Sequence, residues 1–121
     1  MARKILIVDD SATVRQAVRM SLQKTDYECI DAVDGVDALA KLATDTFDLI
    51  MTDINMPNLD GFDLIREIRK MTKYRFTPIV VLTTEASEEL KLRGKAAGAS
   101  GWIVKPFHPE QLIKVTALLL K

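Results

Sequence analysis

Five polar side chains that could bind a metal ion and a phosphate group follow apolar runs of the sequence. They are three carboxylates, a hydroxyl and an amine: Asp9, Asp10, Asp53, Thr83 and Lys105. One pair of acids after one strand is typical of a solvated loop. Carboxylates after two runs, with a lysine and a threonine after two others, are instead typical of a site for metal-assisted phosphoryl chemistry.

The three carboxylates need a counter-charge if they lie together. Two unit charges about 4 Å apart repel by roughly 4 kcal/mol at an effective dielectric constant near 20. Lys105 supplies one positive charge, which cannot neutralise three acids. Mg²⁺ accepts one or two protein carboxylates and keeps its other positions for water and phosphate oxygens. We therefore expect Mg²⁺ as a cofactor beside these acids.

A carboxylate is also the best candidate for a nucleophile. No Ser-His or Cys-His arrangement is evident, and the single histidine, His108, lies just past Lys105-Pro106. Aspartyl phosphates are a known covalent intermediate. Asp53 is favoured because it stands alone, whereas Asp9 and Asp10 can share the metal ion. Lys105 suits a phosphoryl oxygen as a point charge, and Thr83 as a hydrogen-bond donor.

Five apolar runs alternate with five amphipathic stretches, and these elements must position the site. The expected strands are 5–8, 29–33, 47–52, 78–82 and 101–104, and the expected helices are 12–25, 36–43, 64–71, 85–97 and a last one from Pro109. The alternation predicts an α/β fold, a doubly wound five-stranded parallel sheet with helices on both faces. Ligands of such sheets bind outside the carboxyl ends of the strands, where the five polar side chains fall.

Three details of the helices are also predicted. Asp34 is expected to cap the second helix, whose buried stripe would be Val36, Leu39, Leu42 and Ala43. The stretch 85–97 has few large apolar residues, so this helix should be the most weakly anchored. The basic run Arg66, Arg69, Lys70, Lys73 and Arg75 is interpreted as a solvated face.

The bulk properties fit one domain over residues 1–121, with no output domain expected. Lys+Arg and Asp+Glu balance at 17 each, which gives no reason to expect nucleic acid or a membrane surface as a partner. No apolar run is long enough to span a membrane. The single cysteine, Cys29, excludes an intramolecular disulfide and suits the cytoplasm.

Five motifs, in order, resemble the receiver domain of two-component response regulators. They are residues 7–10, 53–57, 60–61, 83–84 and 105–107, and the resemblance covers about residues 3–120. Within that family the sequence is most similar to the stand-alone, CheY-like chemotaxis regulators. The resemblance implies a flavodoxin-like sheet of order 2-1-3-4-5, an order for which flavodoxin and CheY are the standard examples.

The resemblance also implies roles for the acidic residues and their neighbours. Asp53 would be the phosphoacceptor, and Asp10 and Asp53 would bind Mg²⁺ directly. Asp9 would support the metal ion through water, and Asn55 would supply its backbone carbonyl. Asn55 and Glu85 lie at positions that tune the dephosphorylation rate in the family.

Three further residues would carry the response to phosphorylation. Lys105 would hold a phosphoryl oxygen, and Thr83 would be the switch hydroxyl. The switch aromatic, commonly tyrosine or phenylalanine, is here Trp102. Its larger indole puts the usual coupling between threonine and aromatic in question. The Lys105-Pro106 bond is often cis in the family.

The implied function is a single-domain response regulator, which catalyses its own phosphorylation and dephosphorylation without being a conventional enzyme. The expected partners are a sensor histidine kinase and a target such as the flagellar motor switch or a phosphotransfer protein. The target would bind the surface of helix four, strand five and helix five, and the receiver would be a monomer.

Three other functions share part of the pattern. An aspartate-nucleophile phosphatase would carry DxDx[TV] after the first strand, which Asp9-Asp10-Ser11 does not fit. A flavodoxin-like electron carrier would need a neutral, hydroxyl-rich loop there, because two carboxylates would repel the FMN phosphate. A phosphorelay intermediate or phosphate sink, which passes the phosphoryl group to another histidine, would have the same site and stays open.

Overall fold

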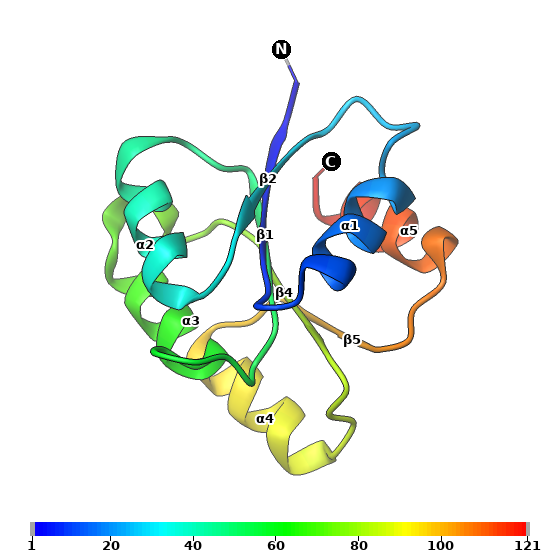
Figure 1. Cartoon of the computed structure of the whole chain (residues 1–121). Helices are drawn as coiled ribbons and strands as arrows, with labels where there is room; N and C mark the ends of the chain where they lie inside the picture. The colour runs from blue at the N-terminus through cyan, green and yellow to red at the C-terminus, as the bar shows by residue number, and fades with distance from the viewer. Residues whose placement is uncertain (1, 121) are drawn as a thin grey trace.

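A parallel five-stranded sheet forms the centre of the molecule (Figure 1). The structure, a computed structural model, describes residues 2–120. The elements in chain order are β1 (Lys4–Val8), α1 (Ala12–Ser21), β2 (Glu28–Ala32), α2 (Gly35–Thr44), β3 (Leu49–Thr52), α3 (Gly61–Lys70), the short 3₁₀ helix η1 (Thr72–Tyr74), β4 (Ile79–Thr83), α4 (Glu88–Ala97), β5 (Gly101–Val104) and α5 (Pro109–Leu119). The strand order β2-β1-β3-β4-β5 confirms the fold class and the order that the family resemblance implied.

Helices cover both faces of the sheet, with α1 and α5 on one face and α2, α3 and α4 on the other (Figure 1). Alternate residues of one strand therefore enter different cores. In β1, Leu6 and Val8 pack with residues of α2 and α3, while Ile5 and Ile7 pack with residues of α1 and α5. Burial on both faces explains why the strands are unbroken apolar runs.

The strand register brings the polar strand ends to one edge of the sheet. Val8 lies opposite Thr52, so the residues that follow, Asp9 and Asp53, are neighbours. The Asp53 N–H donates to the Val8 carbonyl at 3.1 Å. On the other side the Lys105 N–H donates to the Thr83 carbonyl at 2.7 Å. Backbone pairing thus extends past the strands and aligns the loops that carry the predicted site residues.

Two helices are shorter than the sequence predicted. The first was expected over 12–25, but α1 ends at Ser21 because the chain turns there, and the Thr25 hydroxyl donates to the Leu22 carbonyl. The fourth was expected from residue 85, but α4 begins at Glu88 because the Ser87 hydroxyl caps it by accepting from the Leu90 N–H.

The capping of α2 is confirmed, but its predicted buried stripe is partly wrong. Asp34 accepts a hydrogen bond from the Asp37 N–H, as expected. Val36 and Ala43 are exposed, and the buried face is made of Gly35, Ala38 and Leu42. Gly35 packs so closely on Leu59 that an added Cβ would lie 2.9 Å from Leu59 Cβ, so this end of the helix contacts the core through Gly35 and Val36 is left exposed.

The basic run is not wholly a solvated face, because Arg69 is a structural residue. Its Nε and Nη2 donate to the Gly98 carbonyl at 3.1 and 2.7 Å, and its Nη1 donates to the carbonyls of Tyr74 and Thr77 at 2.8 and 2.7 Å. The solvated interpretation was therefore wrong for this residue. A guanidinium can reach carbonyls of two loops at once, and Arg69 joins the end of α3 to the C-terminal end of α4.

The prediction that the fourth helix buries little is confirmed. Gly94 is the only buried residue of α4, and Leu92 is 65% exposed. α4 therefore has little apolar surface holding it to the sheet. Within residues 2–120, none of the helices has the length and apolar character required to span a bilayer.

Candidate functional site

Four of the predicted side chains meet at the carboxyl edge of the sheet. Asp9 and Asp10 follow β1, Asp53 follows β3 and Lys105 follows β5. The Lys105 ammonium donates to Asp9 Oδ2 at 2.9 Å and to Asp53 Oδ2 at 3.0 Å. One carboxylate oxygen from each of the three aspartates lies within 4.8 Å of the others. Residues up to 96 positions apart in the sequence thus form one cluster.

Lys105 is held as a cation in this cluster. Burial by itself favours the neutral amine and would lower its pKa. The hydrogen bonds and charges of Asp9 and Asp53 outweigh that effect, so the pKa of Lys105 is raised above its ordinary value. A fixed positive charge therefore lies between the two buried carboxylates.

The carboxylates differ in how many of their oxygens already have partners. Asp9 is 2% exposed, and its second oxygen accepts from the Ser11 N–H at 2.9 Å. The second oxygen of Asp53 accepts from the Ile54 N–H at 2.6 Å. Asp10 is exposed, and no residue in the described range 2–120 donates a hydrogen bond to its carboxylate. Asp10 thus offers unpartnered oxygens beside two positioned acids.

This donor set fits Mg²⁺. Three carboxylates offer hard oxygen ligands, and a single lysine does not balance their charge. Asn55 follows Asp53 by two residues in the loop to α3 and is exposed. The side of the cluster formed by Asp10 and this loop is consequently open to solvent, which leaves room for the waters and phosphate oxygens that Mg²⁺ retains.

Gly61, whose role the sequence analysis did not identify, packs closely against the backbone of Asp53. A Cβ added to Gly61, the first residue of α3, would lie 2.2 Å from the Asp53 carbonyl oxygen and 2.7 Å from Ile54 Cα. The Gly61 N–H donates to the Ile54 carbonyl at 2.8 Å. Only glycine allows this close approach. The Asp60-Gly61 pair was visible in the sequence, but the contact depends on the fold.

Thr83 and Trp102 are linked through the backbone of Glu85. Thr83 is fully buried, and its hydroxyl accepts from the Glu85 N–H at 3.3 Å. The Glu85 carbonyl accepts from the indole Nε1–H of Trp102 at 2.9 Å. Neither tyrosine nor phenylalanine could donate this bond from the same ring position. The two predicted switch residues are therefore connected by the loop between β4 and α4.

The indole lies against the small residue in α4. A Cβ on Gly94 would approach Trp102 Cζ3 to 2.7 Å, so the absence of a side chain makes room for the ring. Trp102 is half-buried and packs against the core on the α2–α3–α4 face. It thereby contacts both the weakly anchored helix and the loop that precedes it.

Comparison with known proteins identifies the family. The family model described as the response regulator receiver domain matches residues 5–117. The transcriptional regulatory protein ResD of Bacillus subtilis is 40% identical over 96% of this chain, which spans about half the length of ResD (48%). The chemotaxis protein CheY1 of Helicobacter pylori is 37% identical over 90% of each protein.

Solved structures agree with this assignment. The chemotaxis protein CheY4 of Vibrio cholerae has a TM-score of 0.94 to this chain and 48% sequence identity, covering 99% of this chain and all of that one. The match extends over the sheet, all five helices and the loops that carry the acidic cluster. The chain belongs to the family of response regulator receiver domains, which act in two-component signalling systems.

Proposed function

We propose that this receiver accepts a phosphoryl group on Asp53 from the phosphohistidine of a sensor histidine kinase, with Mg²⁺ as cofactor. The observation that carries the proposal is the cluster of Asp9, Asp10 and Asp53 around the ammonium of Lys105. The similarity of this chain to CheY1 and CheY4 supports a role in chemotaxis. The protein would act in the cytoplasm as a monomer.

The proposed reaction is an in-line displacement at phosphorus. An oxygen of Asp53 forms the new P–O bond while the P–N bond to the kinase histidine breaks, and the imidazole leaves with the electron pair. Lys105, already within 3.0 Å of Asp53, holds a phosphoryl oxygen as its charge develops. Because positioning and charge neutralisation supply most of the catalysis in phosphoryl transfer, the cluster needs no general base.

The residues that would hold Mg²⁺ are Asp10 and Asp53 directly, Asp9 through water and Asn55 through its backbone carbonyl. When bound, Mg²⁺ supplies positive charge to the phosphoryl oxygens. The unpartnered carboxylate of Asp10 supports its assignment as a direct ligand. Asn55, two residues after Asp53, and Glu85, two residues after Thr83, would tune the rate of dephosphorylation.

The signal would leave the site through Thr83. The phosphoryl group adds acceptor oxygens near its hydroxyl, which would turn from the Glu85 N–H to donate to them. The Glu85 backbone and the indole bonded to it would follow, and with them the weakly held α4. This is a shift between two states of the protein, biased by contacts of the phosphoryl group. The surface of α4, β5 and α5 would bind the target, such as the flagellar motor switch.

The proposal is tested by measuring the intact mass after incubation with a small-molecule phosphodonor such as acetyl phosphate. Wild type is compared with Asp53→Asn, and with Asp48→Asn as a control. Asp48 lies at the opposite end of β3, where it accepts from the Lys4 N–H at 2.8 Å. We expect one phosphoryl adduct, dependent on Mg²⁺, in wild type and Asp48→Asn but not in Asp53→Asn. An adduct that persists in Asp53→Asn, or that forms equally well with EDTA, would contradict the proposal.

A further inference from the structure

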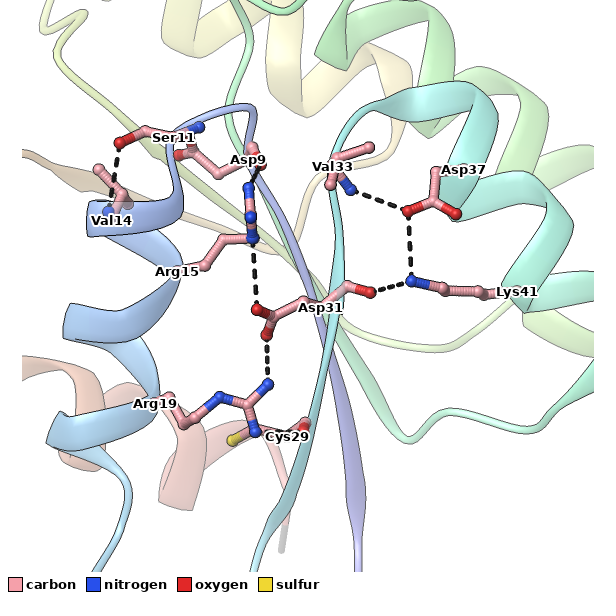
Figure 2. Close-up of polar contacts among 10 residues, drawn as sticks. All are labelled: Asp9, Ser11, Val14, Arg15, Arg19, Cys29, Asp31, Val33, Asp37 and Lys41. Carbon is pink, nitrogen blue, oxygen red and sulfur yellow. Dashed lines mark hydrogen bonds and ion pairs between the residues drawn. The ribbon is translucent and has the colours of Figure 1, made fainter.

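Arg15 joins the acidic site to the edge strand of the sheet (Figure 2). Its Nη1 donates to the Asp9 backbone carbonyl at 2.7 Å, and its Nε donates to Asp31 Oδ2 at 3.3 Å. We propose that Arg15, clamped by Asp31, is a positioning residue that sets the direction of the Asp10 carboxylate for metal binding. The inference deepens the Mg²⁺ site of the proposed function and rests on it.

The Asp9 carbonyl that accepts from Arg15 determines the backbone position of Asp10. It belongs to the planar peptide unit between Asp9 and Asp10, so fixing its direction also fixes the Asp10 N–H and Cα. The neighbouring peptide is fixed too, because the Asp9 N–H donates to the Ala32 carbonyl at 3.2 Å. The carboxylate of Asp10 has no hydrogen bond of its own within residues 2–120. Its place in the acidic cluster therefore depends on the backbone that Arg15 holds.

The clamp on Arg15 is itself well supported. Asp31 is in β2, where it lies opposite Ile7 of β1. Its second carboxylate oxygen accepts from Nη2 of Arg19, one turn further along α1, and its backbone carbonyl accepts from Nζ of Lys41 in α2 (Figure 2). The side chain of Arg15 is only 13% exposed. A partly buried guanidinium with two fixed acceptors has little freedom, as a positioning group requires.

Arg19 provides a matched control within the same network. It bonds the same carboxylate as Arg15 and lies four residues later on the same helix. Its other hydrogen bond goes to the Cys29 carbonyl at 2.9 Å, not to the loop after β1. Replacing either arginine by glutamine removes one positive charge and one ion pair with Asp31. Only the replacement of Arg15 also frees the Asp9 carbonyl.

The sign of the expected effect separates positioning from simple electrostatics. Removing a cation near a Mg²⁺ site lowers the repulsion of the metal ion, so charge alone predicts tighter binding in Arg15→Gln. Loss of positioning predicts weaker binding. Loss of groups that orient metal ligands typically lowers metal affinity by about 10- to 100-fold. We expect the loss of Mg²⁺ affinity in Arg15→Gln to lie near the lower end of this range, because Arg15 acts on Asp10 through one peptide unit.

The test is calorimetric titration of Mg²⁺ into wild type, Arg15→Gln, Arg15→Lys and Arg19→Gln, with folding checked by circular dichroism. Arg15→Gln should weaken binding by about tenfold and Arg19→Gln by less than about twofold. Arg15→Lys keeps the charge but cannot span both acceptors, so it should also bind Mg²⁺ more weakly than wild type. Unchanged or tighter binding by Arg15→Gln would overturn the inference, as would equal losses in Arg15→Gln and Arg19→Gln.

A second measurement needs no metal ion. Amide hydrogen exchange at Asp9 and Ser11 reports on the loop in the Mg²⁺-free protein, because both N–H groups are hydrogen-bonded there. Exchange should become faster in Arg15→Gln and stay at the wild-type rate in Arg19→Gln. Equal rates in Arg15→Gln and wild type would refute the positioning role. A wild-type protein with no measurable Mg²⁺ affinity would instead refute the proposed metal site, and exchange would still decide whether Arg15 orders the loop.

Discussion

Replacing Gly61 by alanine should damage the proposed phosphorylation site and the fold together. The new Cβ would lie 2.2 Å from the carbonyl oxygen of Asp53, whereas real Cβ contacts are essentially never below 3.0 Å. α3 and Asp53 must therefore separate by about 0.8 Å. Because the atoms that clash with the new Cβ belong to the backbone of Asp53 and Ile54, no side-chain rotation can relieve the clash.

The magnitude follows from that displacement. Overpacking of this kind typically costs about 1–3 kcal/mol, and backbone contacts fall at the upper end, so we expect a loss of about 2–3 kcal/mol. For a domain of this size the melting temperature should fall by about 8–12 °C. A misplacement approaching 1 Å at a reacting group lowers rates by about 100-fold, which we expect for phosphorylation of Asp53.

The assay compares Gly61→Ala with Gly35→Ala, which occupies the same position at the start of α2 after a capping aspartate. A Cβ on Gly35 would be 2.9 Å from Leu59 Cβ, so this variant should lose some stability without disturbing the acceptor. Thermal unfolding measures the loss of stability. The phosphorylation rate, measured below the unfolding transition, reports the disturbance of Asp53. If Gly61→Ala phosphorylates as fast as Gly35→Ala, the reasoning about the Asp53 carbonyl is wrong.

Three further predictions concern the buried Tyr74, the predicted switch residue Thr83 and the structural residue Arg69. Tyr74→Phe removes a hydroxyl that donates to the carbonyls of Leu42 and Asp45, so unfolding in urea should show a loss of about 1–3 kcal/mol. Burial raises the pKa of this phenol above its ordinary value. As the pH rises above about 10, the phenol therefore ionises in the unfolded chain before it ionises in the folded protein, so the free energy of unfolding of wild type should fall. That of Tyr74→Phe should fall by less. Thr83→Ala should leave Asp53 phosphorylation intact but abolish the accompanying change in Trp102 fluorescence; a normal fluorescence response would exclude the link through the loop before α4. Arg69→Lys should cost about 1–3 kcal/mol in thermal unfolding because one ammonium cannot reach both loops, and an unchanged melting temperature would exclude this structural role.

The sequence predicted the sheet and the acidic cluster because both depend on local patterns. Unbroken apolar runs identify parallel strands, and parallel strands present their carboxyl ends at the same edge. Asp9, Asp53 and Lys105 could therefore be placed together although they are far apart in the chain. The structure agrees, with distances of 2.9 and 3.0 Å from the lysine to the two acids.

Contacts that depend on how elements pack could not be predicted in this way. Arg69 belongs to a run of basic residues, and nothing in the run itself distinguishes the one that faces the C-terminal end of α4. Arg15 could not be linked to the acidic site, because its partner Asp31 comes from another element. Asp31 lies in β2, which the structure places at the edge of the sheet.

The identity of the residue that carries the phosphoryl group tests the central claim most directly. The phosphorylated protein would be reduced with borohydride, which traps an acyl phosphate as the corresponding alcohol, and the modified position would be located by peptide mass mapping. We predict modification at Asp53 alone, with Asp9 and Asp10 unmodified in the same sample. Trapping at Asp9 or Asp10, or a phosphoryl group located on His108, would contradict the account.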